Sequence, residues 1–311
     1  MSAAVAVVIP LHDMRGFLMR AVRSVLDQGW RDLELVVVDD GSSDGGAELL
    51  QQVDDPRLRC VRTERGGPGA ARNTGARLSH SRWIAFLDAD DEWEKSFLEK
   101  AVAAMGAAPQ TVLVYCDVRA RDRPPRRRDL GSGVVEDYFG TRMSRGVAVS
   151  SSSNCMRRDA FERAGGFCEG RRYAEDIDTW LRLACLGPFY FIAEPLAIIE
   201  VADPARITRT TGSLERALGL HQVYLTYQQQ LARGAIPPAQ RASVRRFVQH
   251  LQGIEATYFA RGGRRLEAWR TLREVPLGSH TWRSWVRCLL RLARPYGAGE
   301  RTADGQGATR R

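Results

Sequence analysis

The chain has 311 residues, of which 44% are hydrophobic and 27% are charged. This composition excludes wholesale disorder and suffices for one large α/β domain with an appendage, or for two medium domains. The formal net charge is +9, but residues 261–311 hold 12 Arg and 4 acidic residues, a net of +8, so residues 1–260 contribute only +1. A nearly neutral body with a basic C-terminal end suggests a catalytic or binding domain plus a contact with an anionic surface.

Cysteine usage and hydropathy bear on the location of the protein. The six cysteines are Cys60, Cys116, Cys155, Cys168, Cys185 and Cys288. None forms a Cys-x-x-Cys pair and most lie in apolar or strand-like runs, which favours reduced, packed thiols over disulfides or zinc. No stretch approaches the ~20 apolar residues of a membrane span, and the N-terminus lacks the pattern of a signal peptide. We therefore expect a cytoplasmic protein.

Apolar runs alternate with helical patterns through the first 116 residues. Residues 4–10 predict a buried strand, and the apolar spacing between residues 17 and 26 predicts a helix. Further strands are predicted at 34–40, 58–61, 83–88 and 111–116, and further helices around Leu49, after the glycine-rich loop 66–69, and over 93–105. The strands are apolar throughout rather than alternating, which is typical of a parallel sheet covered by helices on both faces.

The pattern loosens after residue 116. Residues 119–128 hold six Arg and a Pro pair and predict an exposed loop. Strand-like and helical pieces follow over 147–201, the clearest being the helix EDIDTWLRLACL, and the chain is helical from about residue 213. We expect a first domain over 1–212, a basic helical region over 213–296, and a disordered polar tail over 297–311.

Acidic residues close two of the predicted strands, where ligands of open parallel sheets bind. Taken alone, Asp39 and Asp40 are better explained as turn residues, since they lead into Gly-Ser-Ser. Asp88, Asp90 and Asp91 follow the strand WIAFL, and a helix cap would use only one of these three mutually repelling carboxylates. A divalent cation would relieve the repulsion, so we favour a metal site over a helix cap there.

Two further segments could carry chemistry. The loop Gly66–Gly69 leads into Arg72 and can approach a phosphate closely, although the chain contains neither common nucleotide-binding glycine motif. The acidic pair Glu175-Asp176 opens a predicted helix. It either complements the helix dipole or supplies a general base, and the spacing alone does not separate these two explanations.

Seven segments in fixed order carry a resemblance. They are VVIPLHD, AVRSVLDQ, ELVVVDDGSSDGG, GGPGAARNTGA, FLDADDEW, AGGF and AEDIDTWLRL. This set, over roughly residues 4–201, resembles the family-two glycosyltransferases with the GT-A fold. The resemblance implies a Rossmann-like mixed, mainly parallel sheet with helices on both faces, a catalytic domain over 1–212, and a mainly helical C-terminal region.

The resemblance also implies an activity. A sugar would move from a nucleotide-sugar donor, most commonly a UDP-sugar, to an acceptor hydroxyl with inversion, assisted by Mn²⁺ or Mg²⁺. The acceptor would be a saccharide or a lipid-linked saccharide, in the synthesis of cell-envelope or surface polysaccharides or glycoconjugates.

Position by position, the resemblance assigns residues to the donor. Pro10 and His12 would lie along the nucleobase, and Asp40 would hydrogen-bond it. Arg72 and Asp88 would help to hold the nucleotide.

The remaining assignments concern the metal and the transfer. Asp90, with Asp88, would bind the metal, Glu175 and Asp91 would contact the donor sugar or the acceptor, and Asp176 would be the catalytic base. One departure is the stretch 199–204, which lacks the histidine that the family often has there and points to a different metal shell.

Residues 279–294 predict a helix with an apolar stripe. The stripe consists of Trp282, Trp285, Val286, Leu289, Leu290 and Ala293, with Arg283, Arg287, Arg291 and Arg294 near or opposite it. Such a helix fits the interface of an anionic membrane, but packing against the helix around Leu266 and Trp269 explains the stripe equally well. We favour packing, with peripheral membrane contact at the inner face through the arginines as a supplement.

Two other functions remain open. A sugar-nucleotide nucleotidyltransferase also uses Mg²⁺ on an α/β nucleotide site, but the glycine-rich, Arg- and Lys-bearing loop expected directly after the first strand is missing. The arginine clusters also suggest a non-catalytic protein that binds anionic surfaces. Nucleic acid is not an expected partner, since few aromatic residues interleave with the arginines of the loop.

Overall fold

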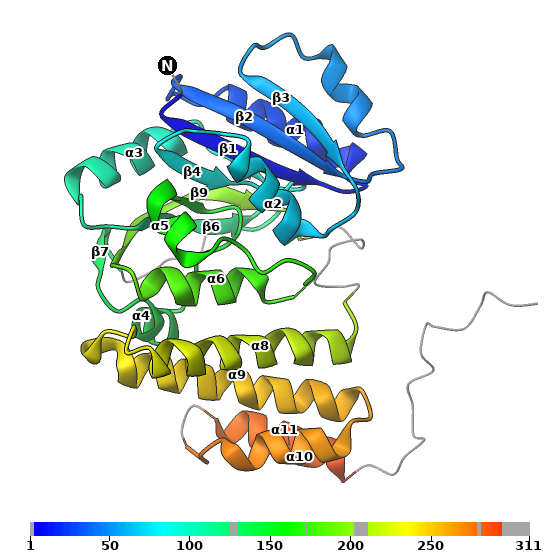
Figure 1. The fold of residues 1–311 in the computed structure, drawn as a ribbon, viewed down its shortest axis with the longest axis vertical. Coiled ribbons are helices and arrows are strands. Elements are labelled where there is room, and N and C mark those ends of the chain that lie inside the picture. Colours follow the sequence, from blue (N-terminus) through cyan, green and yellow to red (C-terminus); the bar gives the residue numbers. More distant parts are fainter. Residues whose placement is uncertain (1–2, 125–129, 172, 202–210, 279–280, 294–311) are drawn as a thin grey trace, which may run out of the picture.

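The computed structural model describes residues 3–124, 130–171, 173–201, 211–278 and 281–293. A single mixed sheet lies between two layers of helices, and further helices are stacked beyond one of these layers (Figure 1). The predicted GT-A-like architecture is thus confirmed in its sheet and in its helical C-terminal region.

The N-terminal half builds the parallel part of the sheet. Its elements are β1 (Val5–Leu11), α1 (Arg15–Leu26), β2 (Leu33–Asp40), the 3-10 helix η1 (Ala47–Gln52), β3 (Leu58–Thr63), α2 (Pro68–Arg77) and β4 (Trp83–Phe86). β1 pairs in parallel with both β2 and β4, and β3 pairs with β2 at the edge. The carboxyl ends of β1, β2 and β4 therefore meet at one edge of the sheet.

The second half extends the sheet and makes it mixed. Its elements are β5 (Glu92–Trp93), α3 (Phe97–Ala107), β6 (Leu113–Ala120), β7 (Gly133–Val135), α4 (Tyr138–Arg145), β8 (Asn154–Arg157), α5 (Arg158–Ala164), α6 (Glu175–Ala184) and β9 (Phe189–Ile199). The main strand order is β3-β2-β1-β4-β8-β6-β9-β5, and β7 pairs with β9. β8 runs antiparallel to both of its neighbours, β4 and β6.

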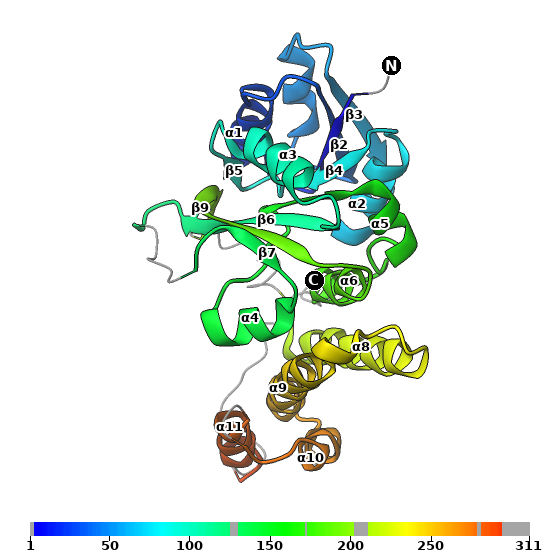
Figure 2. The ribbon, with the colours of Figure 1, turned by 90° about the vertical axis from the view of Figure 1, so that its left-hand side faces the viewer.

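Apolar side chains fill both faces of the sheet. α1 and α3 cover one face, and α2, α5 and α6 cover the other (Figure 2). The predicted helix over 93–105 begins only at Phe97, because Glu92 and Trp93 pair with β9 as strand β5. Burial on both faces explains why these strands are continuously apolar in the sequence.

The C-terminal helices form two layers. They are α8 (Ser213–Ala232), the 3-10 helix η2 (Pro238–Gln240), α9 (Arg241–Arg261), α10 (Arg265–Glu274) and α11 (Trp282–Leu292). Apolar residues of α8 and α9 belong to the same core as one face of the sheet, whereas α10 and α11 pack on α9 around a separate, smaller cluster. Among the described residues, none of the helices is both long and apolar enough to cross a membrane.

The expectation that the apolar stripe of α11 is packed is wrong for most of its residues. α11 turns Ser284 and Cys288 toward the protein, and Trp285 is half-buried with its indole N–H donating to the Val275 carbonyl at 2.9 Å. The exposed members of the stripe are Trp282, Val286, Leu289, Leu290 and Ala293. The expected partners Leu266 and Trp269 are themselves exposed, and Arg294 and the predicted tail lie outside the described residues.

The six cysteines are free thiols, as predicted. Cys116, Cys155 and Cys288 are buried, whereas Cys60 is exposed on β3. Three of the six thiols are therefore buried in the protein interior as expected, and no cysteine pair forms a disulfide.

Candidate active site

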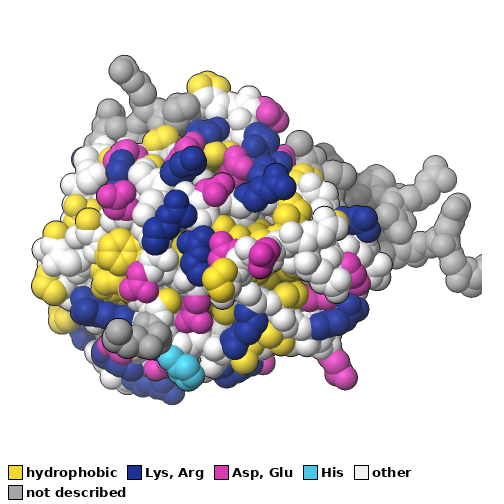
Figure 3. Space-filling model, turned by 90° about the horizontal axis from the view of Figure 1, so that it is seen from above, with side chains coloured by type: hydrophobic (Ala, Val, Ile, Leu, Met, Phe, Trp, Pro, Cys, Tyr) yellow, Lys and Arg dark blue, Asp and Glu magenta, His cyan; other side chains and the backbone are white. Residues whose placement is uncertain are grey.

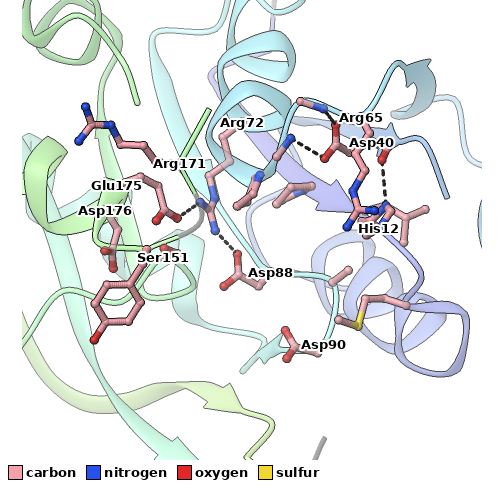
Figure 4. Close-up of a pocket in the computed structure, with 18 of the residues that line it drawn as sticks. His12, Asp40, Arg65, Arg72, Asp88, Asp90, Ser151, Arg171, Glu175 and Asp176 are labelled. Atoms are coloured by element: carbon pink, nitrogen blue, oxygen red, sulfur yellow. Dashed lines mark hydrogen bonds and ion pairs between the residues drawn. The ribbon is translucent and has the colours of Figure 1, made fainter. Parts of the chain in front are cut away.

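A pocket of about 830 Å³ lies at the carboxyl ends of β1, β2 and β4, beside the first turn of α6 (Figure 4). Eight of the nine residues predicted for the site line it. They are Pro10, His12, Asp40, Arg72, Asp88, Asp90, Glu175 and Asp176. The ninth, Asp91, lies outside the lining and is described below.

Asp40 connects the end of β2 to the glycine-rich loop. Its carboxylate accepts hydrogen bonds from the backbone N–H groups of Gly66 at 2.6 Å and Gly67 at 2.8 Å, and its backbone carbonyl lies 2.9 Å from Nδ1 of His12. Gly67 has φ = +88°, a conformation that favours glycine. Asp40 therefore holds the loop beside His12, whereas the predicted contact between Asp40 and a nucleobase stays a prediction.

Asp39 has the turn role expected for it. Its carboxylate accepts the backbone N–H of Ser42 at 2.8 Å and pairs with Arg62 at 3.2 Å. The side chain is fully buried and does not line the pocket.

Arg72 joins the two acidic sides of the pocket. Its Nη2 donates to Asp88 Oδ1 at 2.6 Å and its Nη1 donates to Glu175 Oε1 at 3.1 Å, while the guanidinium stacks on the ring of Phe167 (Figure 4). Burial lowers the pKa of Arg72, but the charges of Asp88 and Glu175 outweigh this effect and raise it above its ordinary value. Arg72 is thus a fixed positive charge between the strand-end acids and α6.

The acidic loop after β4 brings three carboxylates together. Asp88, Asp90 and Asp91 each offer an oxygen within 4.8 Å of the others. Burial and repulsion from Asp90 and Asp88 hold the pKa of Asp91 well above its ordinary range. Hard carboxylate oxygens that repel one another at this spacing fit a divalent cation.

Asp91 does not line the pocket, and the predicted contact between Asp91 and the donor sugar or acceptor stays a prediction. Its carboxylate accepts the Ser152 hydroxyl at 2.6 Å and the backbone N–H of Glu200 at 2.8 Å. Ser152 also accepts the backbone N–H of Asp88 at 3.0 Å. Asp91 therefore fixes the acidic loop to the segment just before β8 and to the residue just after β9.

An ionic network supports the same loop. Arg20 of α1 donates to the backbone carbonyl of Asp90 at 2.9 Å and lies 3.4 Å from the carboxylate of Glu200, which also pairs with Arg121 at 3.2 Å. Glu200 follows β9, within the stretch that lacks the family's histidine; residues 202–204 of that stretch lie outside the described residues.

The start of α6 places two acids in the pocket wall. Ala174 adopts a left-handed backbone conformation, φ = +62°, directly before Glu175. Burial and the charge of Asp176 raise the pKa of Glu175 to about 7, and Arg72 opposes this rise. Burial also raises the pKa of Asp176, against the 2.7 Å hydrogen bond from the Ile177 N–H and the charges of Arg142 and Arg72.

Sequence reasoning missed several residues of this site. Arg142 of α4 donates to the Tyr138 hydroxyl at 3.1 Å, stacks on the ring of Phe247, and exerts its charge on Asp176. Arg65 and Arg171 line the pocket from the loops before α2 and α6. None of the seven segments that carry the resemblance includes residue 142, so no motif singled out Arg142.

Sequence comparisons place the chain in a known family. The sequence profile of the family described as Glycosyl transferase family 2 matches residues 6–165, which is 160 of the 311 residues. The chain is 30% identical to the succinoglycan biosynthesis protein ExoU of Rhizobium meliloti, covering 80% of this chain and 75% of ExoU. It is 28% identical to chondroitin synthase of Escherichia coli over 60% of this chain, but it spans only 27% of the length of that protein.

Solved structures share the fold. TarS 1–349 of S. aureus in complex with UDP-GlcNAc superposes with a TM-score of 0.73 at 13% identity, covering 93% of this chain and 89% of TarS 1–349. A mannosyltransferase from Pyrobaculum calidifontis in complex with GDP-Man and Mn²⁺ gives a TM-score of 0.63 at 21% identity, covering 94% of this chain and 85% of that one. Since the profile matches just over half of the chain and ExoU is similar along most of both lengths, the chain belongs to glycosyl transferase family 2.

Proposed function

We propose that the chain transfers a sugar from a nucleotide-sugar donor to an acceptor hydroxyl with inversion, and that Asp176 is the general base. The observation that carries this proposal is the bridge of Arg72 between Asp88 and Glu175. It sets the strand-end acids and the start of α6 on two sides of one pocket. The side of Asp88 and Asp90 suits a departing diphosphate, and the side of Glu175 and Asp176 suits an attacking hydroxyl.

Asp176 suits proton abstraction from the acceptor. It lines the pocket at the first turn of α6, where the helix dipole favours the ionised form, and its raised pKa strengthens it as a base. The acceptor proton would move to the Asp176 carboxylate as the new glycosidic bond forms on the face of the sugar opposite the leaving group. Glu175, held by Arg72, would orient the donor sugar or the acceptor.

Asp90 and Asp88 would hold a divalent cation, Mn²⁺ or Mg²⁺, with Asp91 fixing the loop behind them. When bound, such a cation stabilises the negative charge that grows on the departing nucleoside diphosphate. The close spacing of the three carboxylates supports this assignment. Arg72 would add a permanent positive charge beside the nucleotide.

The pocket and the relatives support a proposal for the donor and for the acceptor. Pro10, His12 and Asp40 would receive the base and ribose of a UDP-sugar at the end of β1 and β2; TarS, of the same fold, was crystallised with UDP-GlcNAc. The named relatives supply the proposal for the acceptor, a saccharide or lipid-linked saccharide in the synthesis of cell-envelope or surface polysaccharides. The free thiols support a cytoplasmic location.

The test compares Asp176→Asn with the unchanged chain. Both are incubated with UDP-sugars and saccharide acceptors, with Mn²⁺ or with EDTA. We expect transfer that depends on the cation, and a loss of about 10²–10⁴-fold in kcat for Asp176→Asn. Thermal stabilisation by UDP and Mn²⁺ should persist in this variant, because its donor side is intact.

The matched control is Asp159→Asn on α5, whose exposed carboxylate lies outside the pocket. The kcat of this variant should equal that of the unchanged chain. Full turnover by Asp176→Asn would show that another group takes the proton.

A further inference from the structure

The end of the molecule beyond α9 carries large apolar side chains that are exposed to solvent. Leu266 and Trp269 of α10 are exposed by 58% and 47%, and Trp282 and Leu290 of α11 by 47% and 63%. Val286 and Leu289 of α11 are exposed as well. We call these six side chains the C-terminal apolar surface. α10 and α11 lie at the end of the molecule opposite the parallel strands (Figures 1 and 2).

The way α11 docks explains this exposure. A Cβ atom on Gly253 of α9 would lie 2.7 Å from the Cβ of Ser284, so the absence of a side chain lets the two helices approach closely. One turn later, Cys288 contacts the Ala256 carbonyl at 3.6 Å. Because α11 packs through this small-residue side, its apolar stripe is turned outward.

Arginines accompany the exposed apolar residues. On α10, Arg270 follows Leu266 by four positions and Arg273 follows Trp269 by four, so each pair shares a helix face. On α11, Arg287 precedes Leu290 by three. Residues 261–311 carry a net charge of +8. The opposite end of the molecule differs, since acidic and basic side chains are intermixed there (Figure 3).

We propose that the C-terminal apolar surface docks on an anionic lipid bilayer, with the side chains of Trp282, Leu289 and Leu290 at the boundary between headgroups and acyl chains. Exposed tryptophan and leucine beside arginine is the pattern of a helix that lies in a membrane interface. Tryptophan has an apolar ring and a polar N–H, which suits that boundary. The arginines would bind the negative headgroups.

Other occupants of this surface suit it less well. The sequence 294–311 has a single large apolar residue, Tyr296, so it offers little that could cover six apolar side chains. A second copy of the chain would bring the same arginines face to face, and like charges disfavour such an interface. An anionic lipid surface complements both the apolar and the basic side chains.

The test measures flotation of the full chain with phosphatidylcholine vesicles, with and without phosphatidylglycerol. We expect binding only to vesicles that contain the anionic lipid, and weaker binding at high salt. The double variant Leu289→Ser/Leu290→Ser should bind about a hundredfold more weakly, because two leucines lose their burial in lipid. Arg283→Gln/Arg287→Gln should weaken binding by about fivefold per charge.

The matched control is Leu218→Ser. Leu218 of α8 is 54% exposed but does not belong to the C-terminal apolar surface, so its variant should bind like the unchanged chain. Circular dichroism checks that all variants fold, and the oligomeric state is measured without lipid. Absence of binding to anionic vesicles, or unchanged binding by the leucine variant, would overturn the proposal. A chain that dimerises, and whose leucine variant becomes monomeric without any effect of lipid, would assign the surface to a second copy. None of these readouts depends on sugar transfer.

Discussion

Burial and the charge of Asp176 raise the pKa of Glu175, whereas Arg72 lowers it, so the titration of Glu175 reports which effect is larger. Its ordinary pKa of 4.5 applies to the unfolded chain, whereas burial and Asp176 raise its pKa to about 7 in the folded protein despite Arg72. Between these two values the folded protein binds more protons than the unfolded chain. Glu175 therefore contributes stability below this window, and that contribution is lost as the pH rises through it.

The variant Glu175→Gln removes this titration. We expect the Tm of the variant, relative to that of the unchanged chain, to be higher at about pH 8 than at about pH 5. Calorimetry at the two pH values measures the difference. A relative Tm that is nearly the same at the two pH values would mean that Arg72 dominates and that the pKa of Glu175 is not raised, because the carboxylate would then be ionised in both states over this range.

Arg142 acts on the proposed base through its charge and is a positioning residue. Replacing it by methionine removes a positive charge that opposes the rise in the pKa of Asp176. We expect the acidic limb of the pH profile of kcat/KM to move to higher pH in Arg142→Met. Arg145→Met, on the exposed end of the same helix, serves as the control and should leave the profile in place. A lower rate without a shifted profile would indicate that Arg142 has only a structural role.

The residues that meet in the pocket were predictable to different degrees. The acids at 88, 90, 175 and 176 were found because they follow an apolar run or open a helix, and the resemblance then gave them roles. The direction of Asp91 could not be predicted, because it depends on Ser152 and Glu200, which are distant in sequence. The contribution of Arg142 also depends on a tertiary contact that no local pattern encodes.

At the scale of elements, the turn before α2 depends on one backbone conformation. Gly67 has φ = +88°, and its N–H and that of Gly66 bond to Asp40. An alanine at position 67 would be strained in this conformation. We expect Gly67→Ala to lower the free energy of unfolding by about 1–2 kcal/mol, as measured by urea denaturation.

A second glycine provides a control of opposite sign. Gly106 lies near the end of α3, where an added Cβ atom would meet open space, and its φ is not positive. Gly106→Ala should therefore stabilise the chain by about 0.5–1 kcal/mol. Equal effects at the two positions would contradict the role given to the left-handed turn.

Periodicity predicted that residues 282–292 are helical but not which side of that helix packs. The apolar stripe of α11 was expected to be the packed side. Instead, the side that carries Ser284 and Cys288 packs on the protein, because Gly253 lets α11 approach α9 closely. Strands were easier to predict. A strand buried on both faces, such as β1, is apolar at nearly every position, whereas a surface helix carries apolar residues for more than one reason.

At the scale of the whole molecule, the sheet and the helices α8 and α9 share one core. Leu220 and Val223 of α8 and Phe247 and Val248 of α9 are buried in the cluster that covers one face of the sheet. The boundary at residue 212 remains a prediction, but a cut there would expose this apolar surface.

We expect the fragment 1–212 to melt without cooperativity and to bind a hydrophobic dye, whereas the fragment 1–262 should keep a cooperative transition. Of the described helices, the longer fragment loses α10 and α11, which pack around a separate cluster. Calorimetry of the two fragments measures this difference. A sharp transition for 1–212 would show that the first domain folds by itself.

The contact between Gly253 and Ser284 has a consequence for how the protein could diversify. A methyl group at position 253 would occupy the space through which α11 packs on α9, yet it would touch neither the candidate pocket nor the outward-facing tryptophans and leucines. A single small substitution would thus loosen the attachment of α11 while the candidate pocket kept its shape. The proposed membrane docking and the proposed sugar transfer could then be gained, lost or exchanged independently of each other.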